Sequence, residues 1–75
     1  MNKRTVLIIG SIVNETEQFS ALEKGNPLLI AASDLEVITK QVNELMQQQN
    51  YRPDDENPIE DNNRNPTRIL HYIQN

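Results

Sequence analysis

An unbroken apolar run near the start of the chain constrains its fold more than any other feature. The run comprises Val6, Leu7, Ile8 and Ile9, and it resumes at Ile12 and Val13. Most of these residues are β-branched, which predicts a strand over residues 4–13. Because successive side chains of a strand point to opposite faces, a strand that is apolar at every position needs cover on both sides. One small sheet and one helix do not easily cover both sides, so we expect apolar surface to remain exposed. This surplus of apolar surface indicates association with another chain.

The small size of the chain and its lack of cysteine point the same way. A domain of 75 residues buries only about 60% of the surface of its extended chain, so its margin over conformational entropy is thin. Small domains usually add disulfides, a metal or a partner. The sequence has no Cys and one His, which excludes disulfides and thiol nucleophiles and leaves few metal ligands. We therefore expect one domain that associates with itself or with a larger protein.

The segment between the first two predicted strands allows two structures. Residues 27–32 read as a second strand, opened by a proline. One structure for the segment is a short helix over 15–24, with Asn14 and Glu17 in capping-box spacing; the other is a strand over 19–23 that pairs with 28–32 across a turn at Gly25 and Asn26. A parallel crossover needs about a dozen residues, so the spacing favours the antiparallel strand.

Residues 34–49 are predicted to form an amphipathic helix. Ser33 suits the N-cap, and Glu36 follows three residues later as in a capping box. Gln49 falls within the apolar arc, which indicates that the packed face ends there. The arc consists of Leu35, Ile38, Val42, Leu45 and Met46. Such a face normally packs on a core.

The composition changes after this helix. Residues 50–66 hold three prolines, five acidic residues and one aliphatic residue, Ile59. So long a stretch without periodicity is typical of a flexible acidic linker or a long loop. Residues 67–73 recover apolar character and fit a strand or a helix. We favour a strand, because a sheet needs a third member to be stable.

The predicted fold class is therefore α+β, with a small antiparallel sheet packed by one amphipathic helix. The strands lie near residues 4–13, 27–32 and 67–73, and the helix lies at 34–49. The predicted organisation is a compact core (1–49), an acidic linker or loop (50–66) and a C-terminal strand or docking segment (67–75).

Candidate catalytic and metal-binding groups lack the neighbours that such chemistry needs. Gly10 and Ser11 follow a strand but belong to no phosphate-binding motif, so we interpret them as a bulge or bend. The acidic residues between 54 and 61 lack the central glycine of a calcium loop. His71 is the one general-base candidate, and no motif places a nucleophile beside it. We predict no catalytic, cofactor or metal site, and hence no enzyme.

The N-terminus resembles a secretory signal only superficially. Lys3 and Arg4 precede the apolar run, but Asn14 and Glu15 follow it where a small-residue cleavage site would lie. A membrane span needs about 20 apolar residues, and no such stretch occurs. We expect a cytoplasmic protein.

The main functional hypothesis is a small protein-interaction module, a regulator, adaptor or inhibitor that self-associates. The candidate partner-binding residues are the apolar ones of the C-terminal segment and of the helix. They are Ile69, Leu70, Tyr72, Ile73, Leu35, Ile38, Val42 and Leu45. The C-terminal segment adds as a strand to its own sheet, or to that of a partner by β-augmentation.

The alternative hypothesis is a nucleic-acid-binding regulator. Residues 24–30, followed by a capped helix, resemble the strand-then-helix part of small antitoxins, although the DNA-binding N-terminus of that family is missing here. The residues that would contact phosphates are Lys3, Arg4, Arg64 and Arg68. A net charge of -4 works against such binding.

Overall fold

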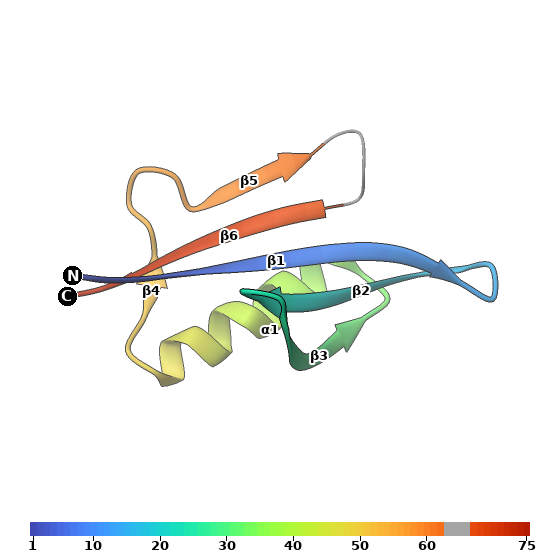
Figure 1. Cartoon of the computed structure of the whole chain (residues 1–75), viewed down its shortest axis with the longest axis horizontal. Helices are drawn as coiled ribbons and strands as arrows, with labels where there is room; N and C mark the ends of the chain where they lie inside the picture. Colours follow the sequence, from blue (N-terminus) through green and yellow to red (C-terminus); the bar gives the residue numbers. More distant parts are fainter. Residues whose placement is uncertain (63–66) are drawn as a thin grey trace.

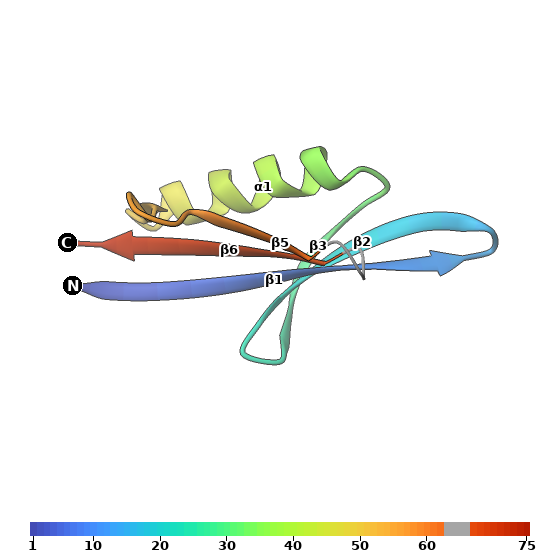
Figure 2. The same cartoon turned by 90° about the horizontal axis from the view of Figure 1, so that it is seen from above.

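One antiparallel sheet with one helix on one of its faces makes up the fold (Figures 1 and 2). The computed structural model describes residues 1–62 and 67–75. The described elements are β1 (Asn2–Val13), β2 (Thr16–Glu23), β3 (Asn26–Ala32), α1 (Leu35–Gln48), β4 (Arg52–Pro53), β5 (Ile59–Asn62) and β6 (Thr67–Gln74). The strand order is β3-β2-β1-β6-β4, and β5 also pairs with β6. The predicted α+β class, with one helix on an antiparallel sheet, is confirmed.

The first three strands form a meander through two tight turns. Asn14 and Glu15 connect β1 to β2 with φ angles of 51° and 63°, and Lys24 and Gly25 connect β2 to β3 with 52° and 81°. Two successive positive φ angles define the turn type whose twist matches that of a hairpin. The antiparallel interpretation of residues 15–24 is confirmed, with its second turn one residue earlier than expected.

The irregularity of this meander lies in β3 and not in β1. The β1–β2 register runs without a shift through Gly10 and its partner Phe19, so the predicted bulge at Gly10 and Ser11 is wrong. The β2–β3 register instead shifts between Ser20 and Leu22. The additional residues at this shift belong to β3, which is an edge strand and has no second neighbour to disturb. The position of Gly10 in the sequence therefore did not indicate where the irregularity lies.

Helix α1 begins one residue later than its sequence suggests. Asp34, and not Ser33, is the N-cap, and its Oδ1 accepts hydrogen bonds from the backbone N–H groups of Glu36 (2.8 Å) and Val37 (3.3 Å). The predicted apolar face packs on the sheet, because Ile38, Val42 and Met46 are fully buried. The core is a single cluster: Val6, Ile8, Phe19, Ala21, Ile38, Val42, Met46, Leu70 and Tyr72.

The C-terminal strand lies next to β1 near the middle of the sheet. β6 pairs with β1 from Asn2↔Gln74 to Ile9↔Thr67, so the prediction of a strand over 67–73 is confirmed. β4 and β5, which pair with the other edge of β6, lie in the segment that we interpreted as a linker. All four residues of β5 are exposed. Only one of them, Ile59, is apolar, so no hydrophobic pattern revealed this strand.

Candidate interaction surface

No described helix covers the face of the sheet opposite α1, although Ile73 at the end of β6, which belongs to this face, is only 6% exposed. Figure 2 shows α1 on one side of the strands only, and Figure 1 looks onto the other side. Because side chains alternate along a strand, Val6 and Ile8 of β1 point toward α1, while Leu7 and Ile9 point away from it. We call this second side the open face.

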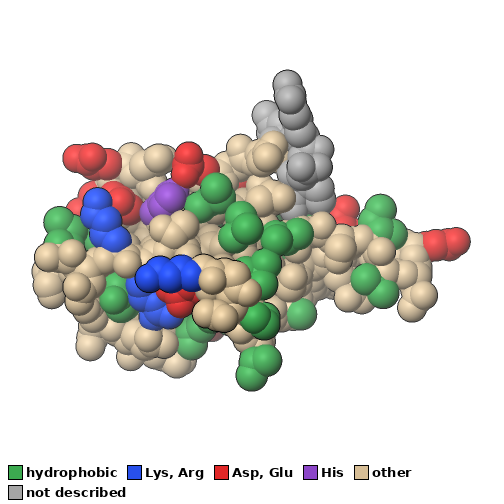
Figure 3. Space-filling view, in the orientation of Figure 1, with side chains coloured by type: hydrophobic (Ala, Val, Ile, Leu, Met, Phe, Trp, Pro, Cys, Tyr) green, Lys and Arg blue, Asp and Glu red, His purple; other side chains and the backbone are tan. Residues whose placement is uncertain are grey.

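A band of apolar side chains crosses the open face. Leu7 lies between Leu22 of β2 and Ile69 of β6, and Leu22 in turn lies opposite Pro27 of β3. Ile9 is the next residue of β1 on the same face, and except for Pro27, which is exposed, these residues are partly exposed. Figure 3 shows a band of hydrophobic side chains across the middle of this face. We call Leu7, Ile9, Leu22, Pro27 and Ile69 the open-face stripe.

A polar cluster borders this stripe on the β6 side. The Oγ1 of Thr5 lies 3.4 Å from Nδ1 of His71, and Nε2 of His71 lies 2.5 Å from a carboxylate oxygen of Glu60. The order of hydroxyl, imidazole and carboxylate is that of a hydrolase triad. The hydroxyl contact is longer than an activated nucleophile usually makes (about 2.6–3.2 Å), and Thr5 and His71 are direct cross-strand neighbours. We interpret the cluster as cross-strand polar pairing.

A cleft of about 440 Å³ lies at the beginning of β1. Three cations, Lys3, Arg4 and Lys24, and one carboxylate, Glu23, line it together with Tyr51. Arg4 donates two hydrogen bonds of 2.7 Å to Glu23, and its guanidinium lies 5.2 Å from the centre of the Tyr51 ring. The hydrogen bonds from Arg4 lower the pKa of Glu23. With Glu23 paired, Lys3 and Lys24 leave this basic cleft with an excess of positive charge.

At the opposite end of β1 the sheet narrows to two strands. β6 accompanies β1 only as far as Ile9, and β3 accompanies β2 only as far as Phe19. Residues 11–18 therefore form a β1–β2 ribbon beyond the rest of the described sheet, on the right in Figure 1. Its acidic residues are Glu15 and Glu17, and it has no Lys or Arg. Ile12, 77% exposed, and Val13, 44% exposed, also lie in it.

The structure separates the predicted partner-binding residues into three groups. Leu70, Tyr72, Ile38 and Val42 belong to the core of the chain itself, and burial raises the pKa of the Tyr72 hydroxyl. Leu35 and Leu45 are partly exposed on α1, and Ile73 is 6% exposed. Only Ile69 lies on the open-face stripe. The other members of the stripe were not singled out as candidates, because their neighbours across the sheet come from distant parts of the sequence.

Two of the cations named in the nucleic-acid hypothesis are paired with carboxylates. Arg4 binds Glu23, and Arg68 binds Asp61 (2.6 Å) and Glu36 (2.9 Å). The carboxylates raise the pKa of both guanidinium groups, in each case mainly through hydrogen bonds. Lys3 lies in the basic cleft, and Arg64 lies outside the described residues. Among the described residues, the guanidinium groups of Arg4 and Arg68 are therefore largely engaged by carboxylates.

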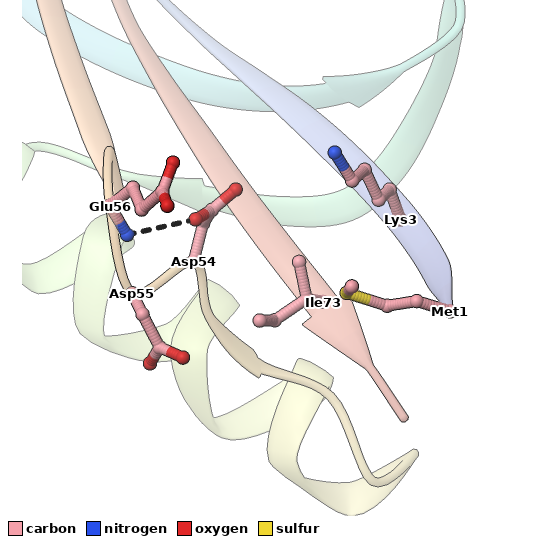
Figure 4. Close-up of a pocket in the computed structure, with 6 residues that line it drawn as sticks. All are labelled: Met1, Lys3, Asp54, Asp55, Glu56 and Ile73. Atoms are coloured by element: carbon pink, nitrogen blue, oxygen red, sulfur yellow. Dashed lines mark hydrogen bonds between the residues drawn. The ribbon is translucent and has the colours of Figure 1, made fainter.

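The acidic residues after β4 do not converge on a common point. Figure 4 shows Asp54 and Glu56 on one side of the chain and Asp55 on the other, near a cavity of about 300 Å³ that Lys3 and Ile73 also line. Asp54 accepts a hydrogen bond from the backbone of Glu56, and Asp55 pairs with Arg52. Within residues 1–62 and 67–75, no group of His, Cys, Asp and Glu is arranged to hold a metal ion.

Comparison with known proteins does not assign the chain to a family. No family model, no curated protein and no solved structure matches it. In the part of the chain that the structure describes, no helix has the length and apolar character needed to cross a membrane.

Proposed function

We propose that this chain is a non-enzymatic protein-interaction module whose open-face stripe binds a second copy of the same chain. The observation that carries the proposal is the stripe itself. Antiparallel sheets with one face in water normally alternate apolar and polar residues. β1 and β6 depart from this pattern at Leu7, Ile9 and Ile69, which point away from the core. Contiguous exposed apolar patches mark interaction sites in soluble proteins.

The surface area of the chain supports the same proposal. The chain exposes 5291 Å², whereas folded monomers of 8.6 kDa expose about 4700 Å². The surplus of about 600 Å² approaches the roughly 800 Å² that each partner buries in an interface of standard size. We take a second copy of the same chain as the partner, because an interface of about this area can form without any other protein. A cytoplasmic location is part of the proposal and rests on the N-terminal sequence alone.

Sedimentation of three versions of the full chain over a hundredfold concentration range tests the proposal. Ile9→Glu places a charge on the stripe, and Val37→Glu places the same charge on an exposed position of α1, where Val37 is 48% exposed. We expect wild type and Val37→Glu to dimerise alike and Ile9→Glu to dimerise at least tenfold more weakly, because association would bury its charge. A monomeric wild type, or equal dimerisation of all three, would overturn the proposal.

Nucleic-acid binding remains the competing hypothesis from the sequence. It predicts that the chain binds a labelled duplex at roughly 50 mM salt and that the affinity falls steeply as salt rises. The ion pairs of Arg4 and Arg68 do not favour it. Duplex binding with that salt dependence, retained in Ile9→Glu, would replace the interaction module as the main hypothesis.

A further inference from the structure

We propose that the basic cleft is a peptide-binding site, which takes an extended acidic segment of another protein as an added strand beside residues 2–5 of β1. The added strand runs antiparallel to β1, as all pairs of strands in the described sheet do. This inference goes beyond the proposed dimer and does not depend on it, because it uses the backbone edge of β1 and not the open-face stripe.

A notch in the sheet leaves one edge of β1 without a neighbour. β1 begins at Asn2, but its pairing with β2 begins only at Leu7, because β2 ends at Glu23 and turns into β3. On its other edge β1 pairs with β6 from Asn2 onward. Figure 1 shows β1 continuing past the β2–β3 turn toward the N-terminus. We call the edge of residues 2–5 on the β2 side the notch edge.

The hydrogen bonds of β6 show which backbone groups point into the notch. His71 donates its N–H to the carbonyl of Pro58 and accepts from the N–H of Asp54, both at 2.9 Å, so its backbone groups face away from β1. Thr5 is the residue of β1 opposite His71. At such a position of an antiparallel pair both residues turn their N–H and C=O outward. The backbone groups of Thr5, and of Lys3 two residues earlier, therefore point into the notch, where the described residues give them no hydrogen-bond partner.

The charges around the notch favour an acidic strand. Arg4 is bonded to Glu23, whereas Lys3 and Lys24 form no ion pair with any described residue. The cleft thus keeps two unpaired cations in a chain whose net charge is -4. Such a local excess attracts acidic segments and disfavours basic ones, because like charges that are brought together at an interface are costly.

The two sides of the notch differ, and the difference predicts the pattern of the bound strand. By alternation along β1, Lys3 and Thr5 point to the open face and Arg4 points to the helix face. On the helix face, Tyr51 and Leu28 line the cleft and pack against the core. Side chains opposite each other on neighbouring strands share a face. We therefore expect acidic residues opposite Lys3 and Thr5 and apolar residues between them. Main-chain bonds supply the affinity of an added strand, and alternate side chains supply its specificity.

The described part of a second copy does not offer such a strand. The acidic residues of the chain between 54 and 61 already lie along β6, where β5 pairs with residues 67–70. Two notch edges that face each other would bring the cations of both copies together. We therefore identify the occupant as a segment of a different protein.

Fluorescence anisotropy with a labelled hexapeptide of alternating glutamate and valine tests the inference in the full chain. At roughly 50 mM salt we expect saturable binding with a Kd below about 1 mM. The same peptide with lysine in place of glutamate is expected to bind at least about tenfold more weakly, because its charges have the same sign as those of the cleft. Equal binding of the two peptides, or no binding of either, would overturn the inference.

Methylation of the peptide backbone tests the added strand itself. A residue in the hydrogen-bonded position opposite Lys3 directs its own N–H at β1, and in the probe that residue is a glutamate. N-methylation of the glutamates removes these donors and is expected to weaken binding by about tenfold or more. The N–H groups of the valines point away from β1, so their methylation is expected to change the affinity by less than about threefold. Equal effects of the two methylations would also overturn the inference.

Matched variants locate the site on the protein. Lys3→Glu is expected to weaken binding of the glutamate–valine peptide about tenfold. Lys40→Glu makes the same charge change at an exposed position of α1, and it is expected to bind within about threefold of wild type. Both positions are exposed, so neither variant is expected to shift the urea midpoint of unfolding. Equal binding by Lys3→Glu and Lys40→Glu would place the peptide elsewhere and overturn the inference.

Ile9→Glu separates this inference from the proposed dimer. The variant changes the open-face stripe and leaves the notch edge intact, so it is expected to bind the peptide like wild type. Loss of peptide binding in Ile9→Glu would mean that the peptide occupies the stripe, and the inference would fall. A wild type that stays monomeric and still binds the peptide would remove the proposed dimer and support the peptide site.

Discussion

The two faces of the sheet are built from similar side chains and differ in what covers them. On the helix face, Val6 and Ile8 are fully buried against α1. On the open face, Leu7 and Ile9, their neighbours in the sequence, remain partly exposed. Hydrophobic side chains alone therefore do not define a core, because a second layer has to be present to remove them from water. Among the described elements, α1 is the helix that supplies such a layer, and it lies on one face only.

The contrast gives the two faces different roles. Residues of the helix face hold the monomer together, so their loss appears as a lower stability of the chain at any concentration. Residues of the open face contribute little to the monomer in this view, and their loss appears in association. Adjacent residues of one strand can separate these roles, since they share the same backbone and differ only in the face they point to.

Leu70 and Ile69 of β6 provide the largest expected difference. Leu70 is 1% exposed, and Leu70→Ala is expected to lower the free energy of unfolding by about 2–5 kcal/mol, because it leaves a cavity in the core. Ile69→Ala, on the open face, is expected to cost about 1 kcal/mol or less in the monomer and to weaken dimerisation. Urea unfolding at low protein concentration measures the first effect, and sedimentation measures the second. Equal losses of monomer stability in the two variants would remove the distinction between the faces.

The arrangement of these faces could be predicted only in part. Apolar runs and helical periodicity predicted β1, β3, α1 and β6, because these elements bury side chains in regular patterns. β5 could not be found in this way, since all of its side chains are exposed and only one of them, Ile59, is apolar. Because residues 50–66 lack an apolar pattern, we interpreted them as an acidic linker or a long loop.

The open-face stripe illustrates a second limit. The apolar character of Leu7 and Ile9 indicated a need for cover, and that inference came from the sequence alone. Their neighbours Leu22 and Ile69 could not be identified, because the register of a sheet depends on turns and pairings that local patterns do not encode. The N-cap was misplaced by one residue because Ser33 and Asp34 are both good caps.

Tyr72 tests how much a buried polar group contributes to the helix face, because its ring lies in the core and its hydroxyl reaches α1. Its hydroxyl donates a hydrogen bond to Oδ1 of Asn43 on α1. Tyr72→Phe is expected to lower the free energy of unfolding by about 1 kcal/mol, leaving dimerisation unchanged. Burial raises the pKa of Tyr72, so wild type keeps the full benefit below the unfolded-state pKa of about 10 and loses stability as the pH rises above it. Urea unfolding at increasing alkaline pH measures this. A loss of stability equally steep in Tyr72→Phe would show that other groups cause it.

The ion pair of Arg4 and Glu23 is expected to give the smallest change in the free energy of unfolding. It tests the contribution of the polar contacts at the border of the helix face. Arg4 also donates a hydrogen bond of 2.6 Å to Gln49, the C-cap residue of α1, so the pair joins β1, β2 and the end of the helix. Glu23→Gln is expected to lower the free energy of unfolding at neutral pH by up to about 1 kcal/mol, as partly exposed ion pairs do.

The pH dependence distinguishes this pair from simple packing. Because Arg4 lowers the pKa of Glu23 in the folded chain, the benefit is present above the unfolded-state pKa of about 4.3. It is lost as the pH falls through the lower folded-state value. Wild type and Glu23→Gln should therefore differ in urea midpoint at pH 7 and converge as the solution is acidified below pH 4. A difference that persists at acid pH would mean that Glu23 stabilises the helix face through its packing and not through its charge.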